Sequence, residues 1–280
     1  MVDFSDPRIA EPDGARGKSA MVGVPRLPIL TNGENRAERA TSAVFGETVS
    51  VYAIQEGFAL VRTDKDHYVG WTKADSLVQL GALPTHRISV PIAYGFSKAD
   101  LKSAPQTTLF LQSHVTVADW HDRFAEVSGI GFVPSAHLTA MGTFRDDPAE
   151  IALGFFSTPY LWGGRDALGL DCTGLTQLAF AECGVALPRD SDMQFAWSGE
   201  AIEGWNEPEA LQRNDLVFWK GHVGIMLNPD TILHANAHHM AVAYEPLAEA
   251  IERIAPLYGQ PIGAKRVAID PSARPEWLQT

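Results

Sequence analysis

Two stretches in the first half of the chain repeat one pattern of apolar residues without a gap. Residues 49–61 read VSVYAIQEGFALV and residues 115–127 read VTVADWHDRFAEV, with Val, Val, Phe, Ala and Val at the same offsets. Each is followed by an aromatic-bearing segment, YVGWTKADSL at 68–77 and IGFVPSAHL at 130–138. The repeat predicts two small β units in tandem, each a strand, a turn, a strand and a further strand. The alternative is a single β-sandwich in which the similarity is accidental.

The length and charge of the chain limit the classes of protein to which it can belong. With 280 residues, 45% hydrophobic and 20% charged, we expect a globular protein of two or three compact domains. The formal net charge is −12, and no run of Lys and Arg is present. We therefore expect neither a nucleic acid nor a membrane as a partner, because both repel an acidic chain.

The expected compartment is the cytoplasm. No stretch of 18 apolar residues is present, so no transmembrane helix is expected. The first 20 residues, MVDFSDPRIAEPDGARGKSA, lack the apolar core of a signal peptide and indicate a polar arm. Two cysteines do not make a disulfide framework.

The second half of the chain opens with a predicted amphipathic helix in TFRDDPAEIALGFF (143–156). Asp146 or Asp147 can cap this helix, and Pro148 suits its first turn. Its apolar residues recur at helical spacing and are expected to be buried: Ile151, Ala152, Phe155 and Phe156. The whole chain then divides into four parts: an N-terminal arm (1–20), two β domains (21–82 and 83–142) and a last domain (143–280).

A cysteine stands where the next helix is expected to begin. In LDCTGLTQLAFAECGVALP (170–188), apolar residues fall at helical spacing, and Gly184 and Pro188 are typical of a helix end. A thiol at a helix N-terminus faces the positive end of the helix dipole, which favours the reactive thiolate. Cys172 is therefore a candidate nucleophile, although simple packing is also open to it. Cys183, at the other end of the helix, is expected to be a packed apolar residue.

Two histidines are expected on neighbouring strands further along the chain. Leu216 to Trp219 reads as a strand, Lys220-Gly221 as a hairpin turn, and HVGIML (222–227) as the return strand, with TILHANA (231–237) as a third. His222 and His234 can then hydrogen-bond, one as a base and the other as the group that orients it. Two alternatives stay open: Asn236 as the orienting group, and a metal site of His234, His238 and His239.

These motifs together resemble the NlpC-type cell-wall cysteine peptidases, which are papain-like enzymes with a Cys-His-His triad. The resemblance covers about residues 155–240 and includes PYLWGGRDALGLDCTG, ALPRDSDMQ, NDLVFW, HVGI and ILHA. It implies that Cys172 is the nucleophile, His222 the general base and acid, and His234 the orienting residue, with Tyr160 near the oxyanion. The chain departs from the family pattern at Thr173, where Ser is usual, and at Asn214, where Gly is usual.

The first half resembles bacterial SH3-like domains, whose strands often end in a segment like HYVGW (67–71); IGFV (130–133) is a looser match. The combined resemblance predicts an α+β chain: a papain-like cysteine peptidase domain preceded by two small SH3-like β-barrels. Such enzymes resemble γ-D-glutamyl-L-diamino acid endopeptidases of the dipeptidyl-peptidase VI type, which act on murein-derived peptides with a free N-terminal L-Ala. The resemblance assigns recognition of that amine to four residues: Glu47, Tyr68, Asp171 and Thr173.

The implied function is hydrolysis of murein peptides during recycling, without a metal or another cofactor. Three other functions are compatible with the sequence. The first is an exported hydrolase that acts on the intact cell wall. The second is a binding protein in which the SH3-like units bind the ligand and the peptidase domain is degenerate. The third is an amidase or acyl transferase that uses the same triad on another γ-glutamyl amide.

Overall fold

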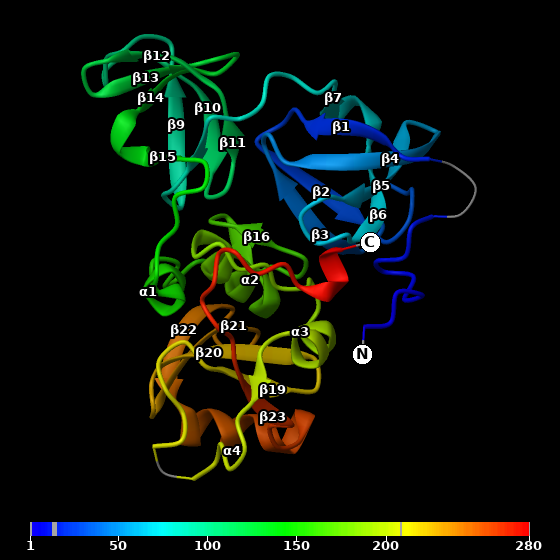
Figure 1. Cartoon of the computed structure of the whole chain (residues 1–280), viewed down its shortest axis with the longest axis vertical. Coiled ribbons are helices and arrows are strands. Elements are labelled where there is room, and N and C mark those ends of the chain that lie inside the picture. The colour runs from blue at the N-terminus through cyan, green and yellow to red at the C-terminus, as the bar shows by residue number, and fades with distance from the viewer. Residues whose placement is uncertain (1, 13–15, 208, 280) are drawn as a thin grey trace. The chain divides into compact units, whose positions relative to one another are not determined.

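The computed structural model describes residues 2–12, 16–207 and 209–279. One compact unit spans Ser5–Thr143, and the other combines the chain from Phe144 onward with the described residues before Ser5 (Figure 1). The predicted boundaries between two β domains stay predictions. Residues 1 and 13–15 of the predicted arm lie outside the described residues, and a strand that begins at Lys18 already belongs to the first sheet.

The first β copy forms a seven-stranded sheet in the order β3-β2-β6-β5-β4-β1-β7. Its buried apolar side chains alternate along the strands and form one core cluster that includes Leu27, Ile29, Val49 and Val61. The strands are β1 Lys18–Val22, β2 Arg26–Leu30, β3 Arg39–Val44, β4 Thr48–Gln55, β5 Phe58–Thr63, β6 Val69–Lys73 and β7 Leu77–Val78.

The second β copy repeats the strand order of the first. Its five-stranded sheet runs β10-β9-β14-β13-β12, and a three-stranded sheet runs β11-β8-β15. The first of these orders matches β3-β2-β6-β5-β4 strand for strand. The strands are β8 His86–Ile88, β9 Ile92–Phe96, β10 Pro105–Phe110, β11 His114–Val115, β12 Val117–His121, β13 Phe124–Val127, β14 Gly131–Pro134 and β15 Leu138–Ala140.

The two copies also agree in register, which confirms that the sequence repeat is a structural one. Val51 pairs with Val61 in the first copy, and the equivalent Val117 pairs with Val127 in the second. A shift of register follows directly after Val51 and again after Val117. In neither copy does the recorded strand order close on itself among the described residues, so the count of two SH3-like barrels stays a prediction.

The second unit is built on a six-stranded sheet, β18-β23-β19-β20-β21-β22. Helices α2 and α4 lie on opposite sides of this sheet (Figure 1). The elements are α1 Pro148–Leu153, β16 Arg165–Asp166, β17 Gly169–Leu170, α2 Cys172–Glu182, α3 Ser191–Trp197, β18 Glu200–Ala201, β19 Leu216–Trp219, β20 His222–Asn228, β21 Thr231–Asn236, β22 Ala241–Pro246, α4 Leu247–Tyr258 and β23 Gly263–Arg266.

The local signals in the sequence correctly predict five of these elements: α1, α2, β19, β20 and β21. Asp147 caps α1 by accepting the Glu150 N–H, and Pro148 is its first residue, as predicted. Phe156 is an exception, because 51% of its surface is exposed, although helical spacing predicted burial. The helix ends at Leu153, before the spacing reaches Phe156, and the ring instead contacts Tyr244 at 5.3 Å between centroids.

The two β copies approach each other closely at one glycine. The His114 N–H donates to the Phe45 carbonyl at 2.9 Å. Gly46 has a φ of +82°, and a Cβ added to it would lie 2.1 Å from the His114 carbonyl oxygen. Glycine is therefore required at position 46 both for its backbone conformation and for the space it leaves.

We predict that Gly46→Ala destabilises the protein more than Gly57→Ala. Gly57 has a φ of +80° but nothing within 4 Å of an added Cβ, so its substitution isolates the conformational cost of about 1–2 kcal/mol. Gly46→Ala adds a steric overlap, and we expect at least about 1 kcal/mol more loss in the free energy of unfolding. Urea denaturation measures both. Equal losses would show that the copies do not meet at His114.

Candidate active site

Cys172 is the first residue of α2, as the sequence predicted. The helix begins there because the Asp171 carboxylate caps it, accepting the Gly174 N–H at 2.7 Å. The N–H groups of the first turn have no partner inside the helix, so that of Cys172 is available to an oxyanion. A Cβ on Gly174 would lie 2.2 Å from the Gly164 carbonyl, so this glycine lets the 161–164 loop pack against the helix start.

A buried ion pair fixes this helix start. Asp171 is 5% exposed and Arg189 only 1%, and the guanidinium binds both carboxylate oxygens. The same carboxylate accepts the Gly163 N–H at 2.9 Å and the Thr173 hydroxyl at 3.1 Å. Asp171 and Thr173 are thus engaged in internal bonds, and their predicted contact with a substrate amine stays a prediction.

The two predicted histidines lie against each other. His222 is the first residue of β20, His234 lies in β21, and Nε2 of His222 is 2.8 Å from Nδ1 of His234. The backbone N–H of Val223 lowers the pKa of the Cys172 thiol, which places the thiol near the start of the strand that carries His222. The alternative orienting residue, Asn236, instead accepts the His239 N–H at 2.9 Å.

Two further residues extend this chain of contacts and were missed by the sequence reading. Glu245 in β22 accepts from Nε2 of His234 at 2.8 Å, and Arg253 in α4 binds the same carboxylate. The only sequence signal for Glu245 was weak. The strands β21 and β22 form a hairpin in which Glu245 pairs with Ile232, which places Glu245 diagonally opposite His234. The contribution of α4 could not be read from that pattern.

Burial favours the neutral forms of the thiol and of the imidazole. Burial and the Asp171 charge raise the pKa of Cys172 to about 12, against the opposing Val223 N–H and Arg189. Burial, with a smaller effect of His234, lowers the pKa of His222 to about 3. Burial of the thiol thus opposes the helix dipole, which was expected to favour the thiolate.

Tyr160 lies near the nucleophile and lines a cavity. Burial, and next the Cys172 charge, raise the pKa of Tyr160, so its phenol keeps its proton and can donate to an oxyanion. The cavity has a volume of about 530 Å³. Its lining residues come from three segments and α4: Tyr160, Trp162, Lys220, Gly221, His222, Asn236, Ala237, His238, Arg253, Ile254, Leu257 and Tyr258.

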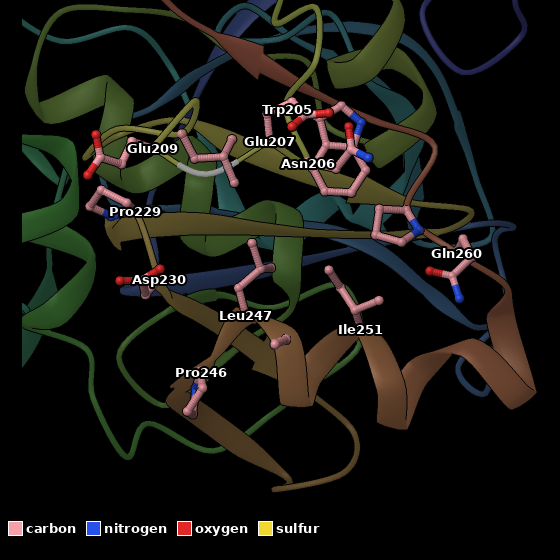
Figure 2. Close-up of a pocket in the computed structure, with 13 residues that line it drawn as sticks. Trp205, Asn206, Glu207, Glu209, Pro229, Asp230, Pro246, Leu247, Ile251 and Gln260 are labelled. Carbon is pink, nitrogen blue, oxygen red and sulfur yellow. The ribbon is translucent and has the colours of Figure 1, made fainter.

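A larger cavity, of about 730 Å³, contains none of the predicted site residues. Leu247 and Ile251 project toward it from α4, and Trp205 and Pro229 lie across from them (Figure 2). Its acidic neighbours Glu207, Glu209 and Asp230 belong to loops. Size alone would therefore point away from the predicted site residues, of which Tyr160 and His222 line the smaller cavity.

Glu47 and Tyr68 belong to the other compact unit and are buried there, at 5% and 7% exposure. One oxygen of Glu47 accepts the Val44 N–H at 3.1 Å, and the other pairs with Lys65 at 3.2 Å. In the second copy the Ser113 hydroxyl accepts the equivalent Phe110 N–H at 3.1 Å. The turn thus needs only one acceptor, and Glu47 supplies a charged oxygen beyond that need. Its role in binding an amine stays a prediction.

The predicted alternative of a metal site takes a different form in the structure. His234, His239 and Glu245 offer ligand atoms within 4.8 Å of one another, whereas His238 is not part of this group. Glu245 already binds the Arg253 guanidinium, and a metal ion would have to displace that charge. Of the three possible ligands, Glu245 is thus already paired with a cationic side chain.

Comparison with known families fits this geometry. Residues 157–253 match the NlpC/P60 family, and residues 29–77 match the bacterial dipeptidyl-peptidase Sh3 domain. The chain carries an NlpC/P60 domain and a bacterial SH3 domain. The NlpC/P60 match includes Cys172, His222, His234 and Glu245. Among the described residues, no helix has the length and apolar character needed to span a membrane.

Two curated relatives have peptidase names. Dipeptidyl-peptidase 6 of Lysinibacillus sphaericus is 33% identical over 137 residues, which cover 48% of this chain and 46% of that protein. The gamma-D-glutamyl-L-lysine dipeptidyl-peptidase of Bacillus subtilis is 26% identical over 232 residues, 75% of this chain and 77% of that protein. The match to the first relative thus spans less than half of its length.

A solved structure has the same fold over most of the chain. The crystal structure of an NlpC/P60 family protein from Bacillus cereus aligns with a TM-score of 0.74 and 19% sequence identity. The alignment covers 89% of this chain and 99% of that protein. Its likeness supports the arrangement of mixed helices and strands described above.

We predict that alkylation of Cys172 by iodoacetamide accelerates about tenfold per pH unit between pH 7 and 10, because the thiolate fraction grows at that rate below the thiol pKa. Mass spectrometry of digested protein measures the rate, with the fully buried Cys183 as an internal reference. A rate that is already constant between pH 5 and 8 would instead indicate a resting thiolate–imidazolium pair and contradict the neutral one.

Proposed function

We propose that the protein is a cysteine peptidase that hydrolyses the bond between γ-D-Glu and a diamino acid in murein peptides with a free N-terminal L-Ala. The observation that carries this proposal is Cys172 at the N-terminus of α2, beside a strand whose His222 bonds to His234 at 2.8 Å. The NlpC/P60 match and the names of the two relatives supply the reaction class and the substrate class.

In the first step, the proton of the Cys172 thiol moves to His222, and the sulfur attacks the γ-carbonyl carbon of D-Glu. The carbonyl π electrons move to the oxygen, which accepts from the Cys172 N–H and the Tyr160 hydroxyl. When the C–N bond breaks, its electron pair stays with the nitrogen, and His222 returns the proton to that leaving amine. The product of this step is a thioester on Cys172.

In the second step, water replaces the amine. His222 takes a proton from the water, and the resulting oxygen nucleophile attacks the thioester carbonyl. The C–S bond breaks, the sulfur leaves with the electron pair, and His222 returns its proton to restore the thiol. L-Ala-D-Glu is released, and no other reactant is needed.

Recognition of the free amine is the finer part of the proposal. A substrate ammonium needs anionic or hydrogen-bonding neighbours when it loses water. Glu47 is proposed to supply the charge and Tyr68 the hydroxyl group. The comparison of Glu47 with Ser113 supports this role, since the turn itself requires only the oxygen that accepts from Val44. The Lys65 ammonium now paired with Glu47 shows that this oxygen accepts from a cation.

A cytoplasmic location and a role in peptide recycling complete the proposal. Both cysteines are free thiols, which a reducing compartment preserves. The net charge of −12 opposes binding to anionic cell-wall polymers, which an enzyme of the intact wall requires.

The test is hydrolysis of L-Ala-γ-D-Glu-diaminopimelate, its N-acetylated form, and both peptides with the Cys172→Ala protein. We expect cleavage of the free-amine peptide only, and none by the variant. Glu47→Ser should raise KM at least about tenfold, because it removes the charge and introduces the hydroxyl that serves the equivalent turn at Ser113. Equal cleavage of both peptides would reject the amine recognition, and cleavage of neither would reject this substrate class.

We further predict a preference for diaminopimelate over lysine as the leaving residue. His222 must reach the leaving amine, so the rest of that residue enters the cavity that His222 lines. Lys220, His238 and Arg253 also line it, and none of its described lining residues is acidic. The extra carboxylate of diaminopimelate is favoured there by roughly tenfold in kcat/KM.

Lys220→Gln should lower this preference, whereas Lys98→Gln, an exposed lysine of the other unit, should leave it unchanged. Competition kinetics with the two peptides measures the ratio. An equal or reversed preference in the unaltered protein would mean that the cavity does not receive the leaving residue.

A further inference from the structure

The contacts of His222 continue through three more side chains. Nε2 of His222 faces Nδ1 of His234, and Nε2 of His234 faces Oε1 of Glu245, each at 2.8 Å. Arg253 donates from two nitrogens to the same carboxylate. His234 has no exposed surface, so solvent does not compete for its ring nitrogens. The hydrogen bonds among these four side chains therefore determine which ring nitrogen of each histidine carries a proton.

Glu245 determines which ring nitrogen of His234 carries the proton. Its carboxylate is held ionised: burial would raise the pKa, but the bonds from His234 and Arg253 outweigh it and keep the pKa at about 2. An ionised carboxylate only accepts, so Nε2 of His234 must carry the hydrogen. In a neutral ring, Nδ1 of His234 is then bare and accepts from Nε2 of His222.

The tautomer of His234 decides whether His222 can accept the proton of the Cys172 thiol. When Nε2 of His222 carries the hydrogen, its Nδ1 is bare and can take the proton of the thiol. If His234 carried its proton on Nδ1 instead, that hydrogen would be donated to Nε2 of His222. The His222 proton would then sit on Nδ1, and the ring could not act as a base toward Cys172.

We propose that Glu245, held in place by Arg253, is a positioning residue that fixes the tautomer of His234 and, through it, the tautomer in which His222 can accept the thiol proton. Glu245 neither gains nor loses a proton in this scheme. The single transfer runs from the Cys172 sulfur to Nδ1 of His222. The inference rests on the proposed function for the roles of Cys172 and His222, but the placement of protons does not need a substrate.

Arg253 makes the loss of Glu245 more damaging than the loss of one acceptor. A guanidinium only donates, so once the carboxylate is gone it favours a bare Nε2 on His234, which is the unproductive tautomer. Glu245→Leu should therefore shift His234 toward Nδ1–H. Glu245→Gln keeps an amide oxygen that can still accept from Nε2, and it should retain more of the productive tautomer.

The experiment combines two measurements on the full chain. Imidazole ¹⁵N NMR distinguishes protonated from bare ring nitrogens, and peptide hydrolysis gives kcat and KM. We expect Nε2–H on both histidines in the unaltered protein and an Nδ1–H population in Glu245→Leu. We expect kcat to fall by roughly 10²- to 10⁴-fold in Glu245→Leu with little change in KM, as when the orienting acid of a triad is lost. Glu245→Gln should lie between the two.

Glu252→Leu is the matched control, because Glu252 is an exposed glutamate of α4 next to Arg253 in sequence. It should change neither the tautomers nor kcat. The proposal is overturned if His234 carries its proton on Nδ1 in the unaltered protein, or if Glu245→Leu loses activity with unchanged tautomers. If the tautomers behave as expected and no murein peptide is cleaved, the proposed function fails while the positioning role stands.

Discussion

The buried ion pair between Asp171 and Arg189 is the interaction on which the catalytic unit depends. One carboxylate caps α2, binds the 163 amide of the preceding loop and accepts from a guanidinium that is 1% exposed. Removing one partner would leave a charge buried without compensation, which typically costs about 3–5 kcal/mol. Cys172, the amides at the start of α2 and the loop are thus placed by one charge, which also raises the pKa of the thiol beside it. The carboxylate that builds this helix start therefore also opposes ionisation of the thiol.

Much of the fold could be predicted because its signals are local. The alternation of apolar residues in the two repeated stretches and the spacing from Leu216 to Asn236 reflect single strands and tight turns, which neighbouring residues determine. The cap at Asp147 and the end of α2 before Gly184, with its φ of +76°, are likewise decided within a few residues. Cys172, His222 and His234 were identified from motifs of the same short range, and the structure brings the two histidines into contact.

What the sequence did not reveal depends on contacts between distant segments. Arg253 reaches Glu245 from a helix, and nothing in the local pattern of that helix marks the guanidinium as part of the site. The pKa of Cys172 depends on how completely the thiol is buried, which the helix-start argument does not contain. Phe156 was assigned to a buried face because spacing alone does not say where a helix ends. The predicted contacts of Glu47 and Tyr68 with a substrate involve two compact units, and no pattern within either unit can specify them.

The internal repeat separates the architecture of the first unit from its chemistry. Ser113 and Glu47 hold equivalent turns by the same hydrogen bond, so the fold is indifferent to which of them is present. The acceptor at this turn can therefore be charged in one copy and neutral in the other, so a duplicated module can differ in chemistry between its copies while both keep the same turn.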